Sequence, residues 1–163
     1  MLVKVKYTND EAAALYRKAS GDLNKEVPFK VHDDDFCYDC VATKCEEIAP
    51  RVYRYDLGLS FQIVDDIKFL DRGDIILDID GRARSSVWKT GMVLANCEAT
   101  IDKGYTGKVY AVFYHVLDNM PKYEVGDRVC QIKIGATIPM DFIVVDEFDE
   151  TSRGEGGFGS TGQ

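Results

Sequence analysis

The feature that most restricts the fold of this chain is a series of short, strand-like segments separated by polar turns. Residues 57–63 alternate apolar and polar side chains with the two-residue period of a β-strand. Residues 71–74 and 126–127 have the composition of turns between strands. Because short strands at regular spacing are typical of sandwiches and barrels, the sequence predicts an all-β fold.

One helix is predicted, close to the N-terminus. Asn9, Asp10 and Glu11 supply polar groups for its start, the helix covers residues 11–19, and Gly21 ends it. The predicted strands cover residues 3–7, 36–43, 50–55, 57–63, 67–70, 75–79, 91–96, 108–116, 129–134 and 141–145, and residues 27–31 are a short extended piece.

Length and charge argue against several classes of partner. The chain has 163 residues, enough for one domain, and a net charge of −8. An acidic surface repels polymeric nucleic acid, and the sequence has no local basic patch to offset that repulsion. Its apolar runs are shorter than the ~18 residues of a membrane-spanning helix. We therefore expect neither polymeric nucleic acid nor a membrane as a partner.

The five cysteines favour free thiols in a reducing cytoplasm, which is the expected location. Cys37 and Cys40 have the spacing of half a zinc site. A structural zinc site needs four ligands, however, and the nearest additional candidates are Cys45 and His32. The zinc interpretation is therefore the weaker of the two.

Three internal stretches are polar where a core strand would be apolar. Arg84, Ser85 and Ser86 offer donors that suit phosphate oxygens. Asp102 lies in a turn that resembles the tip of a hairpin, where it could accept a proton from water near a bound phosphate. Gln131 could reach an anion. Taken alone, each stretch is also explained as an ordinary turn or surface loop. The stretches are residues 83–89, 96–107 and 126–132.

The last eleven residues, 153–163, are rich in glycine and contain one arginine and one phenylalanine. Glycine lets backbone N–H groups approach an anion, and arginine is suited to phosphate. The ring of Phe158 offers a flat face for a base. On composition alone, a disordered tail is the simpler interpretation.

In this order, the stretches resemble the trimeric deoxyuridine triphosphatase (dUTPase) family over residues 36–163. Cys37 and Ala99 stand where the family has glycine. The five matching motifs contain Tyr38-Asp39, then Arg84-Ser85-Ser86 with Lys89-Thr90-Gly91, then Asn96 with Ile101-Asp102-x-x-Tyr105-x-Gly107, then Gly126-Asp127-Arg128-x-x-Gln131, and finally Arg153-Gly154-x-x-Gly157-Phe158-Gly159-Ser160-Thr161-Gly162.

The resemblance implies a β jelly roll, or distorted β-barrel, that assembles as a homotrimer with active sites at the subunit interfaces. The implied reaction is hydrolysis of dUTP to dUMP and pyrophosphate with Mg²⁺. Residues 1–147 would form the β domain, with residues 10–20 as a helical addition. Residues 148–163 would form a mobile lid over a site made by other subunits.

The resemblance also implies a role for each matched residue. Asp102 would activate the water that attacks the α-phosphorus, and Tyr105 would pack under the deoxyribose. Asp39 would reach the magnesium ion through water. The implied substrate-binding residues are Arg84, Ser85, Ser86 and Gln131 at the phosphates, Asn96 and Ile101 at the uracil side, and Arg153, Phe158, Gly159, Ser160 and Thr161 in the lid.

Two alternatives remain open at this point. A dCTP deaminase shares the implied fold, but that family carries a glutamate where this chain has Val112 and an arginine where it has Lys89. A catalytically idle trimer that binds a regulatory partner is the second alternative. The complete set of motif residues favours an enzyme.

Overall fold

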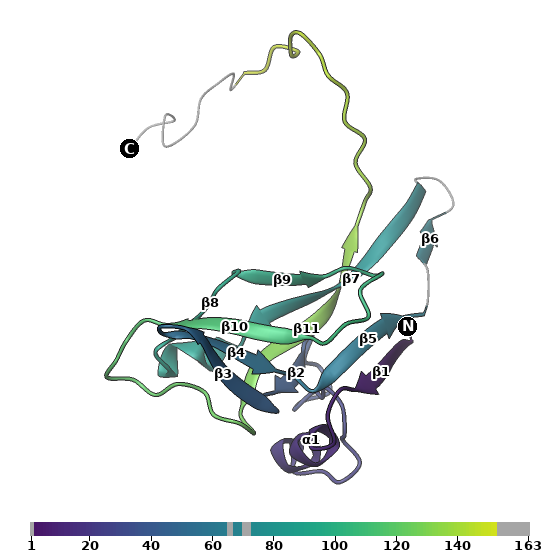
Figure 1. Cartoon of the computed structure of the whole chain (residues 1–163). Coiled ribbons are helices and arrows are strands. Elements are labelled where there is room, and N and C mark those ends of the chain that lie inside the picture. Colours follow the sequence, from purple (N-terminus) through teal and green to yellow (C-terminus); the bar gives the residue numbers. More distant parts are fainter. Residues whose placement is uncertain (1, 65–66, 70–72, 153–163) are drawn as a thin grey trace.

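The computed structural model describes residues 2–64, 67–69 and 73–152, which form β-strands around one α-helix (Figure 1). The α-helix, α1, spans Ala12–Ser20, and a short 3-10 helix, η1, spans Ser85–Lys89. The predicted all-β fold with one short helix is thus confirmed. The strands span Val3–Tyr7 (β1), Tyr38–Val41 (β2), Lys44–Ala49 (β3), Val52–Asp56 (β4), Leu59–Ile63 (β5), Ile67–Phe69 (β6), Gly73–Ala83 (β7), Met92–Leu94 (β8), Glu98–Ile101 (β9), Tyr110–His115 (β10) and Arg128–Thr137 (β11).

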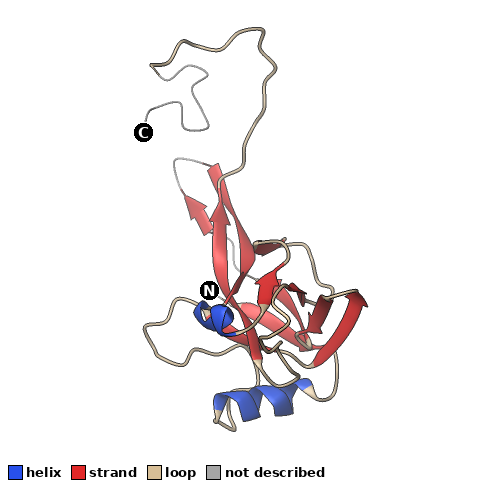
Figure 2. Cartoon of the chain, turned by 90° about the vertical axis from the view of Figure 1, so that its left-hand side faces the viewer, coloured by secondary structure: helices blue, strands red, loops and turns tan. Residues whose placement is uncertain are grey.

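The described strands form three antiparallel sheets. One sheet joins β1 to β5, the second has the order β3-β4-β10-β8, and the third has the order β2-β11-β7-β6 with β9 also paired to β7. Figures 1 and 2 show the sheets packed against one another as one body, with the chain after β11 extending away from it. Packed antiparallel sheets of this kind are of the jelly-roll type.

An aromatic cluster lies at the centre of the core. The rings of Tyr55, Phe113 and Tyr123 meet edge to face, with centroids 5.5 to 6.2 Å apart. The Tyr55 hydroxyl donates to the Tyr123 carbonyl over 2.9 Å. Burial raises the pKa of Tyr55, so its hydroxyl remains a neutral donor. The cluster joins β4 and β10 to the loop that leads into β11.

Helix α1 packs onto this body through the face that carries Ala12 and Tyr16. Ala12 and Tyr16 are fully buried, and the Tyr16 hydroxyl donates to the Leu57 carbonyl over 3.2 Å. Gly21 ends the helix in the left-handed conformation, as predicted (φ 70°). The predicted N-terminal cap is wrong, because Glu11 at the cap position makes no side-chain cap bond and Asn9 donates instead to Thr43.

The predicted and observed strands differ at two places. Both differences arise because neighbouring segments decide whether an extended segment joins a sheet. Strand β3 is not predicted from the sequence, because its side chains do not alternate between apolar and polar. It lies at the edge of its sheet, and its side chains are mostly exposed and charged. The strand predicted at residues 141–145 is wrong, since these residues are extended but exposed and unassigned to a sheet. An extended segment becomes a strand only when a neighbouring backbone accepts its hydrogen bonds.

The segment around Asp102 turns as predicted but does not join the two strands of one hairpin. The Tyr105 amide donates to the Asp102 carbonyl over 2.9 Å, which closes the turn. Strand β9 before the turn pairs with β7, whereas β10 after it pairs with β4 and β8. The turn therefore connects two sheets.

Candidate active site

A cavity of about 440 Å³ lies where β2, β7 and β11 come together. Asp39 of β2, Arg84 and Ser85 after β7, and Arg128 and Gln131 of β11 line one side of it. The opposite wall comes from the loop before β2 and includes Phe29, Val31, His32, Asp35, Phe36 and Cys37. Three of the matched motifs, far apart in sequence, therefore meet at one concave surface.

Pairing between strands explains why these side chains meet. Gln131 lies opposite Asp39 on one side and opposite Arg82 on the other. Residues directly opposite each other in an antiparallel pair point to the same face of the sheet. Arg84, two residues after Arg82, follows the same face into the cavity. The Gln131 amide donates to the Ala83 carbonyl over 3.2 Å, which holds the start of the loop.

Arg84 is fixed by three side-chain hydrogen bonds. Its Nε donates to Asp39 Oδ1 over 2.7 Å and its second terminal nitrogen to Asp39 Oδ2 over 3.3 Å. The other terminal nitrogen donates to the Ser86 hydroxyl over 3.1 Å. Ser85 lines the cavity directly, whereas Ser86 accepts a hydrogen bond that helps to hold Arg84 in place. A bidentate guanidinium in this position is suited to a phosphate chain.

Arg128 belongs to the fourth motif, where the family resemblance implies no role of its own for it, yet it lines the same cavity. Arg128 donates to Asp39 Oδ2 over 3.0 Å. An unbroken alternation along β11 would place it on the opposite face from Gln131, but the ladder slips between Arg128 and Cys130. A bulge of this kind re-aims a side chain. Gly126, two residues before Arg128, has the positive φ of 95° that favours glycine.

The loop wall of the cavity is held by a small turn. The His32 amide donates to the Asp35 carboxylate over 2.9 Å, and the Asp35 amide donates back to the His32 carbonyl over 3.1 Å. The bond from the His32 backbone lowers the pKa of Asp35. Asp35 therefore remains ionised beside the two arginines near neutral pH.

The nucleoside-binding residues implied by the third motif flank β9, with Asn96 before the strand and Asp102 and Tyr105 after it. Asp102 and Asn96 are exposed, and Tyr105 donates its hydroxyl to the Lys108 carbonyl over 2.8 Å. A Cβ at Gly107 would lie only 2.5 Å from the Tyr105 hydroxyl. The tyrosine can therefore adopt this position only above a glycine. Ile101, the last residue of β9, is half-buried.

Within one chain, the turn that carries Asp102 (the nucleoside half of the site) lies apart from the arginine-lined cavity (the phosphate half). Ile101 lies opposite Ile79 in β7, and Arg84 follows five residues after Ile79. At about 3.3 Å per strand residue, Asp102 and Arg84 are ~20 Å apart along β7. The predicted site is therefore divided into a phosphate half and a nucleoside half. The predicted lid residues Arg153, Phe158, Gly159, Ser160 and Thr161 lie outside the described residues.

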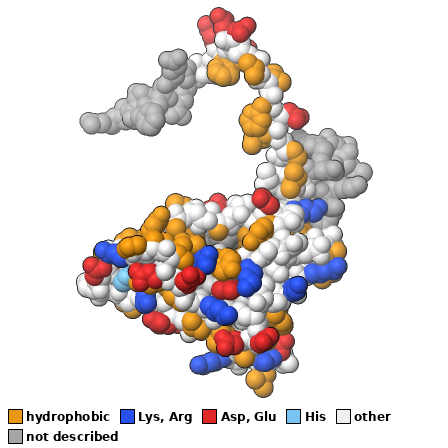
Figure 3. Space-filling model, in the orientation of Figure 1, with side chains coloured by type: hydrophobic (Ala, Val, Ile, Leu, Met, Phe, Trp, Pro, Cys, Tyr) orange, Lys and Arg blue, Asp and Glu red, His pale blue; other side chains and the backbone are white. Residues whose placement is uncertain are grey.

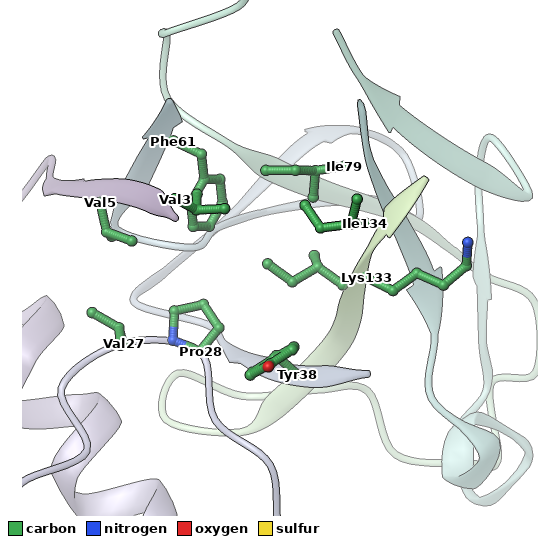
Figure 4. Close-up of a pocket in the computed structure, with 10 residues that line it drawn as sticks. Val3, Val5, Val27, Pro28, Tyr38, Phe61, Ile79, Lys133 and Ile134 are labelled. Carbon is green, nitrogen blue, oxygen red and sulfur yellow. The ribbon is translucent and has the colours of Figure 1, made fainter. Parts of the chain in front are cut away.

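A second cavity, of about 300 Å³, is an apolar groove between β1, β5, β11 and the segment before β2 (Figure 4). The Lys133 side chain points away from the other lining residues (Figure 4), and its ammonium group donates to Asp80 over 2.9 Å. The apolar groove is lined by Val3, Val5, Val27, Pro28, Tyr38, Phe61, Ile79, Ile132, Lys133 and Ile134.

The described part of the chain has neither a cluster of metal ligands nor a membrane-spanning helix. There, no group of three His, Cys, Asp or Glu side chains is placed to hold a metal ion. Contact with Cys130 and burial raise the pKa of Cys40, so this thiol stays protonated, unlike a zinc ligand. None of the helices in residues 2–64, 67–69 and 73–152 has the length and hydropathy to cross a membrane.

Fold and site together define a jelly-roll protein with a guanidinium-lined anion pocket and a separate, tyrosine-bearing turn. The dUTPase family model matches residues 82–162, which include the pocket arginines and this turn. Residues 82–162 of this chain therefore belong to the dUTPase family.

Curated relatives share the family name. The chain is 41% identical over 71 residues to a deoxyuridine 5'-triphosphate nucleotidohydrolase of Helicobacter pylori (strain Shi470), covering 44% of this chain and 49% of the relative. It is 40% identical over 75 residues to the corresponding protein of Actinobacillus succinogenes, covering 46% and 50%. The chain thus spans about half the length of the curated relatives it matches.

Solved structures extend the likeness in fold to nearly the whole chain. A mutant dUTPase of Staphylococcus bacteriophage 80alpha with dUpNHpp superposes with a TM-score of 0.72 at 20% identity, covering 99% of both chains. A mutant dUTPase from phage phi11 of S. aureus, described with a structural Mg(II) ion, gives 0.64 at 16% identity, covering 92% of this chain and all of the other.

Proposed function

We propose that this protein hydrolyses dUTP to dUMP and pyrophosphate. The observation that carries the proposal is the cavity in which Arg84, Ser85 and Gln131 converge, because these residues come from two separate family motifs. Their donors match the oxygens of a phosphate chain. Phosphoryl transfer depends mostly on positioning and charge stabilisation, which this donor set provides without a protein nucleophile.

In this proposal the turn after β9 supplies the base and the sugar contact. Asp102, exposed at the turn, takes a proton from the water that attacks the α-phosphorus. Tyr105, held over Gly107, packs against the deoxyribose and leaves no room for a 2′-hydroxyl. Asn96 and the backbone near Ile101 recognise uracil. Arg153 and Phe158 close over the γ-phosphate and the base.

Magnesium belongs to the proposal, but the residues that the structure describes do not fit a direct protein site for it. The Asp39 carboxylate, the implied contact, already accepts three hydrogen bonds from Arg84 and Arg128. Magnesium commonly takes its oxygen ligands from substrate phosphates and water. When bound with the triphosphate, the ion would offset phosphate charge. The described residues bind and orient the phosphates independently of it.

A homotrimer is also part of the proposal, and the divided site supports it. The ~20 Å between Asp102 and Arg84 in one chain is too far for both to act on one α-phosphate. The arrangement becomes productive if the phosphate half of one subunit meets the nucleoside half of another. Free thiols at all five cysteines are in keeping with a cytoplasmic location, which we also propose.

The chain after β11 supplies a surface for such an assembly. Phe142, Ile143 and Val144 are between 83% and 101% exposed, and the segment runs away from the body (Figure 3). An isolated apolar segment of this kind marks an interaction site. We propose that residues 138–145 of one copy cover the apolar groove of another. Among the described strands β1 pairs only with β5, so its other edge can accept an added strand there.

Val144→Asp tests this contact. In a free monomer the change alters only a fully exposed side chain and should be neutral. In the proposed trimer it buries a charge in each of three copies, so we expect sedimentation to show mainly monomers at micromolar protein. Asp149→Asn, an exposed change in the same segment, is the matched control. An unchanged sedimentation coefficient for Val144→Asp would refute the contact.

The substrate is tested by pyrophosphate release from each deoxynucleoside and ribonucleoside triphosphate with Mg²⁺. We expect dUTP to be preferred over dTTP and UTP by at least about 100-fold in kcat/KM, because steric and hydrogen-bond rejection act together. Ammonia release from dCTP would instead indicate the deaminase alternative. Comparable rates for all substrates would contradict the proposed function.

A further inference from the structure

We infer that Asp39 is a positioning residue that fixes Arg84 and Arg128 as a pair of phosphate-binding groups. The inference deepens the proposed function and rests on it. It departs from the water-mediated magnesium contact that the family resemblance implies for Asp39. It also assigns Arg128 to phosphate binding alongside Arg84.

The burial of Asp39 supports this role. Its side chain is 10% exposed and lies between two cationic side chains that are 21% and 35% exposed. Both carboxylate oxygens are engaged, Oδ1 by Arg84 and Oδ2 by both arginines. A nearly buried carboxylate needs such partners. Three of the roughly four acceptor sites of this carboxylate are therefore used by the guanidinium groups.

The arginines keep donors for a ligand. A guanidinium has five N–H groups, more than the bonds that join either arginine to Asp39 and Ser86. Both arginines line the cavity, and the bulge in β11 is what brings Arg128 to this face. Without Asp39, two long cationic side chains would repel each other and lose their fixed geometry. Binding would then require them to be ordered anew.

Whether Asp39→Asn weakens or tightens pyrophosphate binding distinguishes a role in positioning the arginines from a role in charge or magnesium binding. If Asp39 only added negative charge to the cavity, or contacted magnesium, Asp39→Asn would leave pyrophosphate binding unchanged or tighten it when magnesium is absent. If Asp39 positions the arginines, the same variant binds pyrophosphate more weakly despite the removed charge. We expect a loss of about tenfold, because two rotamer-rich side chains are released.

The experiment is calorimetric titration of the full-length protein with inorganic pyrophosphate, with and without Mg²⁺, followed by dUTP kinetics over a range of Mg²⁺ concentrations. For Asp39→Asn we expect weaker pyrophosphate binding and a raised KM for dUTP. The Mg²⁺ concentration giving half-maximal rate should not change. Asp80→Asn is the matched control, because Asp80 is also a part-buried, ion-paired carboxylate of this sheet but lies outside the cavity.

Arg128→Lys provides a second test if Asp39→Asn does not fold. It keeps the charge but loses the guanidinium fork, so pyrophosphate binding should weaken, whereas Arg82→Lys should have little effect. The inference is overturned if Arg128→Lys binds pyrophosphate normally, or if Asp39→Asn raises the Mg²⁺ requirement with unchanged magnesium-free binding. Pyrophosphate binding does not depend on the base, so a failed dUTP preference would be seen separately.

Discussion

Asp102→Asn is expected to lower kcat for dUTP hydrolysis by about 100- to 10,000-fold, the range that a general base contributes. Asparagine keeps the shape of the turn, because the bond that closes it joins the Tyr105 amide to the backbone carbonyl of residue 102. It cannot accept a proton from water. Rapid-mixing measurement of pyrophosphate release would give kcat, and titration with a non-hydrolysable analogue would give affinity.

The same experiment needs a control for charge at the turn. Asp118→Asn removes another exposed, loop carboxylate and should leave kcat within about twofold of the wild type. Analogue binding should largely survive in Asp102→Asn, because the phosphate-binding residues lie elsewhere. Undiminished turnover in Asp102→Asn would remove this residue from the catalytic role.

A chain that ends at Ser152 is expected to lose at least about 100-fold in kcat/KM, since the removed residues include Arg153 and Phe158 of the proposed lid. Loss of one donor to a developing charge typically costs 100-fold or more, and an open site also admits water. Pyrophosphate release from dUTP, compared with the full-length chain at equal subunit concentration, measures the loss.

Folding and assembly provide the controls for the truncation. All strands and the apolar residues 138–145 remain, so the melting temperature and sedimentation coefficient should stay unchanged. Phe158→Ala in the full-length chain should give part of the loss, mainly in KM, because it removes only the cover over the base. A truncated protein that hydrolyses dUTP normally would show that the lid is dispensable.

Local patterns predicted the elements whose partners lie within the chain. The period-two alternation in residues 57–63 corresponds to β5, and Gly21 ends α1 where expected. The same patterns failed where a neighbour decides the outcome. Residues 141–145 have the composition of a strand but no sheet edge beside them, and β3 is a strand without apolar alternation because it lies at an edge.

In the candidate site, too, the sequence predicted some residues and missed the features that depend on strand pairing. The order of the motifs identified Arg84, Ser85 and Gln131, and the structure brings these three to one cavity. No pattern in the sequence could show that Asp39 is shared by two arginines, because the second one reaches it through a slip in the β11 ladder. Nor could spacing show that Asp102 lies far from the cavity, which follows from the pairing of β9 with β7.

The packing of α1 has a consequence for how this chain can vary. Gly58 has φ +70°, and a Cβ there would lie 2.8 Å from the Ala12 Cβ and 2.7 Å from Thr43. Tyr16 fills the core beside it with no exposed surface. A helix that lies outside the family motifs is thus an interlocked part of the barrel. A side chain at position 58 therefore requires room from residues 12 and 43, and loss of the helix would expose the core surface that Tyr16 now covers.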